Sequence, residues 1–170
     1  MPAAGACSPA AENGRAMPTT HEERFLEILD EAQCRRLLLT RAIGRLGFTE
    51  DALPAILPVA FTLQSGHVLI AVRHDSSVVN AVRRSVVAFQ VDEYDPVART
   101  GWSVTVVGPS RIITDPREVA GLGGVPLSPP PPDPAWCYVA VLLGLVRGWR
   151  LAPYPAGVGA TDVGATRTAP

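Results

Sequence analysis

Hydrophobic and polar residues alternate along most of the chain, which is the pattern of β-strands with one buried face. Between residues 53 and 63, for example, Val59, Phe61 and Leu63 fall on one face. Residues 64–67 (QSGH) have the composition of a hairpin turn. The alternating stretches predict strands over residues 43–49, 53–63, 68–72, 86–92, 102–114 and, with a turn near Gly144, 136–151.

Helical periodicity is confined to short segments. Residues 20–29 open with the capping-box pair Thr20 and Glu23 and predict one helix, and Asp30 with Gln33 repeats the pattern for a second. Residues 76–83 predict a further short helix. Another begins after Asp115, an N-cap followed by proline at the first helical position, and ends near the glycines 121, 123 and 124. Six or more antiparallel strands with few helices indicate a barrel or a sandwich.

The length of 170 residues predicts a single domain. Residues 1–19 and 153–170 are rich in small residues and proline without periodicity, so we expect two disordered tails around a folded domain at 20–152. Residues 126–134 (PLSPPPPDP) predict an extended, polyproline-like connection over the surface.

Composition excludes several partners. The net charge is −1 and the 15 basic residues, all arginine, are dispersed, so no nucleic-acid partner is expected. The longest apolar run, 139–146, is too short to span a bilayer, and no secretory signal precedes it, which favours a soluble cytoplasmic protein. Cys7, Cys34 and Cys137 are widely spaced and are expected to be free thiols.

Familiar catalytic and metal-binding patterns do not occur. His21, His67 and His74 lie on different predicted elements and predict no metal site. A GxSxG nucleophile elbow is missing, and the glycines at 121–124 follow a helix rather than the strand that a dinucleotide-binding loop requires.

The segment from Arg73 to Ser77 is the best candidate for chemistry. It joins the end of a strand to the start of a helix, where hydroxyls and free N–H groups beside an arginine can hold an anion. Ordinary helix capping is the alternative. Trp102-Ser103 and Trp149-Arg150 offer an aromatic ring and a planar cation near strand ends, or else serve the core and a sheet edge.

Several segments, in order, resemble the pyridoxamine 5′-phosphate oxidase-like superfamily, and more narrowly its actinobacterial-type flavin-nucleotide-binding branch with the split β-barrel fold. The resemblance covers residues 22–152. The segments that carry it are IGRLGF (43–48), LPVAF (57–61), VVAFQVDEYD (86–95), GWSVTVVGPSRIITDP (101–116) and GWRL (148–151).

The resemblance implies a mainly β protein, a six-stranded antiparallel split β-barrel with short flanking helices, that forms a homodimer and binds FMN between the subunits. Carried over by position, the flavin phosphate would lie near Arg73, Ser76, Ser77 and Asn80. The ring edge would follow Pro58 and Val59, and Trp102, Ser103 and Arg150 would approach from the partner subunit. A flavin-dependent oxidoreductase acting on a small molecule is the implied function, with a deazaflavin coenzyme as the alternative to FMN.

The chain departs from the family's pattern at the phosphate region. The arginine expected near the end of the third strand is Ala71, and the glycine–hydroxyl–lysine step is Asp75-Ser76-Ser77. An aspartate repels a phosphate unless Arg73 neutralises it. A degenerate barrel that binds another ligand or a protein is therefore an alternative function, and a haem-handling barrel is a third, against which the scattered histidines argue.

Overall fold

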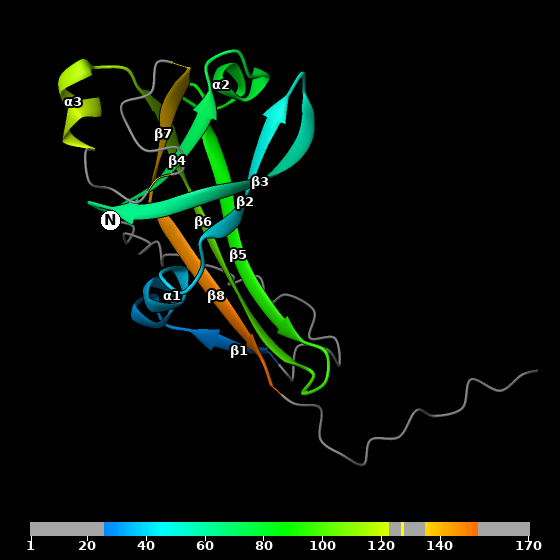
Figure 1. Ribbon diagram of the computed structural model, residues 1–170. Coiled ribbons are helices and arrows are strands. Elements are labelled where there is room, and N and C mark those ends of the chain that lie inside the picture. Colours follow the sequence, from blue (N-terminus) through cyan, green and yellow to red (C-terminus); the bar gives the residue numbers. More distant parts are fainter. Residues whose placement is uncertain (1–25, 123–126, 128–134, 153–170) are drawn as a thin grey trace, which may run out of the picture.

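The computed structural model describes residues 26–122, 127 and 135–152. The two expected tails, the Thr20–Glu23 capping pair and the proline-rich connection apart from Leu127 lie outside these residues. Within them the chain forms eight strands and three helices (Figure 1). The strands are β1 (Leu26–Leu29), β2 (Ile43–Glu50), β3 (Leu53–Gln64), β4 (His67–Arg73), β5 (Val86–Asp95), β6 (Thr100–Ile113), β7 (Trp136–Leu142) and β8 (Leu145–Leu151), and the helices are α1 (Glu31–Leu38), α2 (Ser77–Ala81) and α3 (Pro116–Gly121).

Six of these strands close into an antiparallel ring in the order β6-β5-β2-β3-β4-β7, because β7 pairs with both β4 and β6. The long strand β6 makes this possible. Its first part pairs with β5 and β8, and its last four residues, beyond the Gly108-Pro109 step, pair with β7. The six-stranded split barrel expected from the sequence is confirmed, and β8 and β1 extend one of its sheets outside the ring.

The barrel interior is filled by the inward-facing residues of the alternating strands. Leu46, Phe89 and Val106 are fully buried on neighbouring strands, and the rings of Phe61 and Phe89 meet edge to face with centroids 4.7 Å apart. A second, smaller cluster lies under α3 on the outside of the ring: Leu69, Ile113, Leu122, Leu127, Tyr138 and Ala140. Figure 1 shows α2 and α3 toward one end of the molecule and α1 with β1 toward the other.

The prediction of a helix over residues 20–29 is wrong for its described part, because Leu26–Leu29 is a strand that pairs antiparallel with β8. Apolar residues at 28 and 29 suit a helix face as well as an edge strand, and only the partner strand more than 100 residues away decides between them. The helix after Asp30 is confirmed: the Asp30 carboxylate accepts the Gln33 N–H at 2.7 Å, and the Gln33 side chain accepts the Asp30 N–H at 2.8 Å.

One face of the sheet formed by β1, β8, β6, β5, β2 and β3 has no element of the described chain packed on it. Directly paired residues point to the same side, so the row Ile56–Gly47–Ala88–Val107–Leu145 faces away from the barrel interior. Eight large apolar side chains on this outer face are 40 to 73% exposed, namely Leu26, Ile28, Ile43, Ile56, Val86, Tyr94, Leu145 and Trp149.

Candidate functional site

A hollow opens where the strands β3 and β4 separate. Their pairing ends at Phe61 and Ile70, and beyond it residues 57–60 and 71–73 line a volume of about 520 Å³ between the two strands. The remaining lining residues are Asp75, Ser76 and Trp136. Pro58, Val59, Arg73 and Ser76, which the family resemblance assigns to one site, line this one hollow.

Arg73 and Asp75 are the charged residues among those that line this hollow, and they are paired with each other. The Arg73 guanidinium donates from Nε to one carboxylate oxygen of Asp75 at 2.9 Å and from Nη2 to the other at 2.8 Å. These hydrogen bonds lower the pKa of Asp75 and raise that of Arg73, so both groups stay charged at neutral pH. The lining thus carries no net charge, and Arg73 does neutralise the acid.

The hydroxyl expected to help hold an anion is already used. Ser76 is the N-cap of α2, and its Oγ accepts the Val78 N–H at 3.3 Å. The helix has only five residues, so its N-terminus adds little positive potential. Ser77 and Asn80 are exposed residues of α2 that do not line the hollow. Of the four residues predicted near a phosphate, Arg73 and Ser76 line this hollow.

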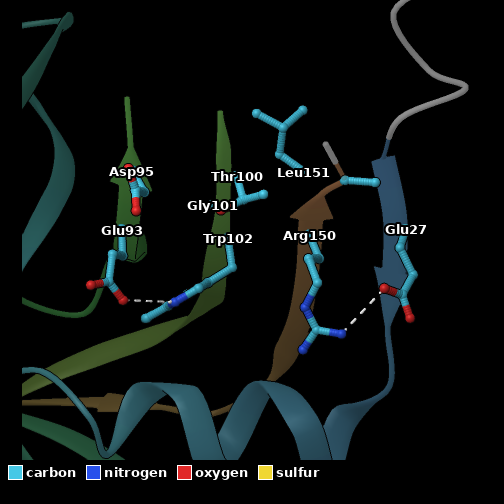
Figure 2. A pocket seen from close by; sticks show the side chains of 9 residues that line it. Glu27, Glu93, Asp95, Thr100, Gly101, Trp102, Arg150 and Leu151 are labelled. Carbon is cyan, nitrogen blue, oxygen red and sulfur yellow. Dashed lines mark hydrogen bonds and ion pairs between the residues drawn. The ribbon is translucent and has the colours of Figure 1, made fainter. Parts of the chain in front are cut away.

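Trp102 and Arg150 lie in a second hollow, of about 520 Å³, at the open end of the extended sheet (Figure 2). Glu93, Trp102, Arg150 and Glu27 form one row across β5, β6, β8 and β1, because each pairs directly with the next. Arg150 donates to the Glu27 carboxylate at 3.2 Å, and the Trp102 indole N–H donates to Glu93 at 3.1 Å.

The indole of Trp102 is held from two sides. The Arg41 guanidinium lies 5.8 Å from the ring centroid and forms an ion pair with Glu93. The hydrogen bond from Arg41 lowers the pKa of Glu93 most, and the hydrogen bond from Trp102 lowers it further. The row is therefore a set of mutually paired charges around an aromatic ring that is fixed in place.

Ser103 points to the opposite face from Trp102, because neighbouring residues of a strand alternate. It pairs with Asp92 and Trp149 on the outer face, and its hydroxyl accepts the Gln90 side-chain N–H at 2.9 Å. The structure therefore separates Ser103 from Arg150. This separation could be predicted from the sequence, because Trp102 and Ser103 are consecutive residues of a predicted strand.

Trp136 and the wall residues Leu57, Ala60 and Val72 of the first hollow are absent from the sequence-based selection. Trp136 pairs directly with Arg73 across β4 and β7. This pairing joins residues 63 positions apart, and only the aromatic character of Trp136 at a strand start could have signalled it.

Potential metal ligands do not gather anywhere in the described part of the chain in a group of three or more. His67 lies at the β3–β4 turn with Nδ1 3.0 Å from the Ser65 carbonyl oxygen, His74 is exposed after β4, and His21 lies outside the described residues. No helix in the part that the structure describes has the length and apolarity to cross a membrane.

Comparison with known proteins gives a consistent result. Residues 30–139 match the family described as pyridoxamine 5′-phosphate oxidase. An uncharacterized protein of Mycobacterium tuberculosis is 41% identical over 111 residues, which are 62% of this chain and 72% of the relative. The fold is similar to the FAD binding protein from Mycobacterium smegmatis (30% identity, TM-score 0.60, covering 74% of this chain and 97% of that one). It is also similar to a conserved protein of unknown function from Corynebacterium diphtheriae (26% identity, TM-score 0.64, covering 75% and 99%).

Proposed function

Because the chain belongs to the pyridoxamine 5′-phosphate oxidase family, we propose that it binds a flavin in the hollow between β3 and β4. The observation that carries this proposal is that Pro58, Val59, Arg73 and Ser76 line one hollow of a size suited to a small ligand. The similar protein of Mycobacterium smegmatis is a FAD binding protein, which supports a flavin as the ligand class.

The chemical character of the residues lining the hollow also suits a flavin. Leu57, Val59, Ala60 and Val72 supply apolar contact for a flat ring. Between Leu57 and Ala60 the strand β3 pairs with β2 on one side only, so the backbone edge that faces β4 is free to hydrogen-bond the polar edge of the ring. Arg73 and Ser76, at the far end, would contact the ribityl or phosphate part.

We propose that the protein is a flavin-dependent oxidoreductase of a small molecule, with a deazaflavin coenzyme as the alternative to FMN. A bound flavin supplies the hydride chemistry. The chain's own residues bind and orient it: the walls exclude water from the ring, and Arg73 fixes the polar end. This function requires no side chain as a catalytic acid or base.

The site is proposed to be completed by a second copy of the chain. Eight large apolar side chains on the outer face remain exposed in one chain, and a contiguous exposed apolar surface of this kind favours a protein partner. Polar pairs in the middle of this face, Arg45 with Asp92 and Gln90 with Ser103, suit an interface with a satisfied polar centre. Of the three residues expected to approach the flavin from the partner, Ser103 lies on this face and would do so, whereas Trp102 and Arg150 lie on the opposite face of the sheet.

Light scattering tests the dimer. Wild-type protein is expected at twice the mass of one chain, and Ile56→Asp, which places a charge on the outer face, is expected at the monomer mass. Val97→Asp is the matched control, since Val97 is 92% exposed in the β5–β6 turn rather than on the outer face. A monomeric wild type, or the same mass for Ile56→Asp as for wild type, contradicts the proposal.

Flavin binding is tested by visible absorbance and fluorescence quenching during titration with FMN, FAD, riboflavin and a deazaflavin. Arg73→Gln is expected to weaken the binding of phosphate-bearing flavins, because it removes the cation of the hollow. Arg117→Gln removes a cation from α3, which does not line the hollow, and is expected to bind like wild type. If none of these flavins binds, the proposed function is wrong.

A binding module without catalysis is the second candidate, and one observation favours it. The two polar groups that would hold a phosphate are already engaged, Arg73 with Asp75 and Ser76 with Val78. A protein that binds flavin but whose bound flavin is not reduced by nicotinamide or deazaflavin donors would support this candidate. A cytoplasmic location belongs to both candidates and is a prediction of the sequence.

A further inference from the structure

The ion pair in the β3–β4 hollow points to a role for Asp75. We propose that Asp75 makes this hollow selective against phosphate monoesters, so that it takes flavins with a diester phosphate, or with none, in preference to the FMN expected from the sequence. The inference rests on the proposed flavin site and concerns which flavin it accepts.

The charge balance of the hollow is the first reason. Its lining consists of apolar residues, Ser76, and the Arg73–Asp75 pair, whose charges cancel. A phosphate monoester carries up to two negative charges at neutral pH, whereas each phosphate of a diester carries one. The monoester of FMN therefore brings up to two charges on one phosphate next to one cation and one anion, whereas FAD spreads its two charges over two phosphates and places only one of them there.

The geometry of the pair is the second reason. Arginine binds a phosphate best with a fork of two parallel N–H donors. In Arg73 the Nε and Nη2 donors are both directed at Asp75, at 2.9 and 2.8 Å. Both side chains are more than half exposed, so the pair is weak and a ligand can open it. An anion then competes with Asp75 for the same donors and is repelled by it once the pair opens.

Trp136 indicates which flavin the hollow accommodates instead. It lies directly across from Arg73 in the β4–β7 register and is partly exposed in the lining of the same hollow. An aromatic side chain beside the polar end of the site provides a stacking surface for a base. A flavin dinucleotide such as FAD has its second base beyond the phosphates, where Trp136 can contact it.

The experiment compares riboflavin, FMN and FAD by fluorescence titration of the full chain in low salt and in 0.5 M NaCl. Wild type is expected to bind FAD at least as tightly as FMN. Asp75→Asn is expected to raise the affinity for FMN about tenfold in low salt and less in high salt, because it removes repulsion close to a dianion. The affinity for riboflavin, which has no charge, should change by less than about twofold.

Two further variants complete the test. Asp51→Asn makes the same chemical change in the β2–β3 turn, outside the lining of the hollow, and is expected to leave all three affinities unchanged. Trp136→Leu is expected to weaken FAD about tenfold and to spare FMN.

The outcomes separate the two proposals. The selectivity is overturned if wild type binds FMN about tenfold more tightly than FAD. It is also overturned if Asp75→Asn changes the affinities for riboflavin and FMN equally. In both cases the protein still binds a flavin, and the proposed function stands. If neither wild type nor Asp75→Asn binds any of the three flavins, the proposed function and the inference both fail.

Discussion

Gly44 is the position where a single added methyl group should disturb the barrel most clearly. A Cβ atom there would lie 2.2 Å from Cζ and 2.7 Å from Cε2 of Phe89, and 2.9 Å from the Gln90 carbonyl oxygen. Carbon atoms in contact are normally 3.5–4.0 Å apart. Phe89 is fully buried and rests against Phe61, so its ring cannot move aside without displacing the interior of the barrel.

We therefore expect Gly44→Ala to lower the free energy of unfolding by about 3 kcal/mol, the upper end of the usual cost of overpacking a core. Replacing the Phe89 ring with the smaller leucine side chain should relieve the clash. Phe89→Leu alone is expected to cost about 1.5 kcal/mol, and the double variant should be about 1–2 kcal/mol more stable than the sum of the two single losses predicts. This coupling identifies the contact between the two positions as the cause.

Urea unfolding followed by tryptophan fluorescence measures all three losses. The control is Gly47→Ala in the same strand, where a Cβ would meet Ala88 at an ordinary 3.6 Å and a change within about 0.5 kcal/mol is expected. Since Gly47 lies on the outer face, the variants are compared only after light scattering shows the same mass for each. A loss for Gly44→Ala no larger than that for Gly47→Ala, or strict additivity with Phe89→Leu, would refute the reasoning.

Three other predictions use the same unfolding assay. Ser110→Ala should cost about 1–3 kcal/mol, because the buried Ser110 hydroxyl donates to the Val82 carbonyl oxygen at 2.6 Å, and a loss below about 0.5 kcal/mol would contradict that role. Asp30→Ala should lower the free energy of unfolding by about 0.5–2 kcal/mol, because the α1 cap is lost, whereas Asp30→Asn should keep most of the stability that the cap provides. The hydrogen bond from Arg111 lowers the pKa of Glu118, so the stability from this pair is present above the unfolded pKa of about 4.3 and is lost as the pH falls through the lower folded pKa. Glu118→Gln should accordingly reduce the loss of stability between pH 5 and 3, as seen in the urea midpoints, and an unchanged acid profile would show that the pair contributes nothing measurable.

The part of the candidate site around Arg73 and Ser76 could be predicted from the residues of one short segment, and the family resemblance implied Pro58 and Val59. Pro58 with Val59 and Arg73 with Ser76 come from two strands that a hairpin connects, so residues near their open ends return to each other. Trp136 could not be found in this way, since it joins the hollow through a register with β4 that depends on the whole ring. The family resemblance also implies Ser77 and Asn80, which are exposed residues of α2 outside the lining of the hollow.

The sequence by itself determined most of the strands, most helix starts and a mainly antiparallel β fold, either a barrel or a sandwich. Alternation, turn residues and caps such as Asp30 with Gln33 act over a few residues and need no partner. The tertiary structure decided what depends on distant pairing: that Leu26–Leu29 is a strand on β8, that β3 and β4 separate to leave a hollow, and that Arg73 meets Asp75 and Trp136 there. The physical reason is that a strand edge has no preference of its own until another strand satisfies its backbone groups.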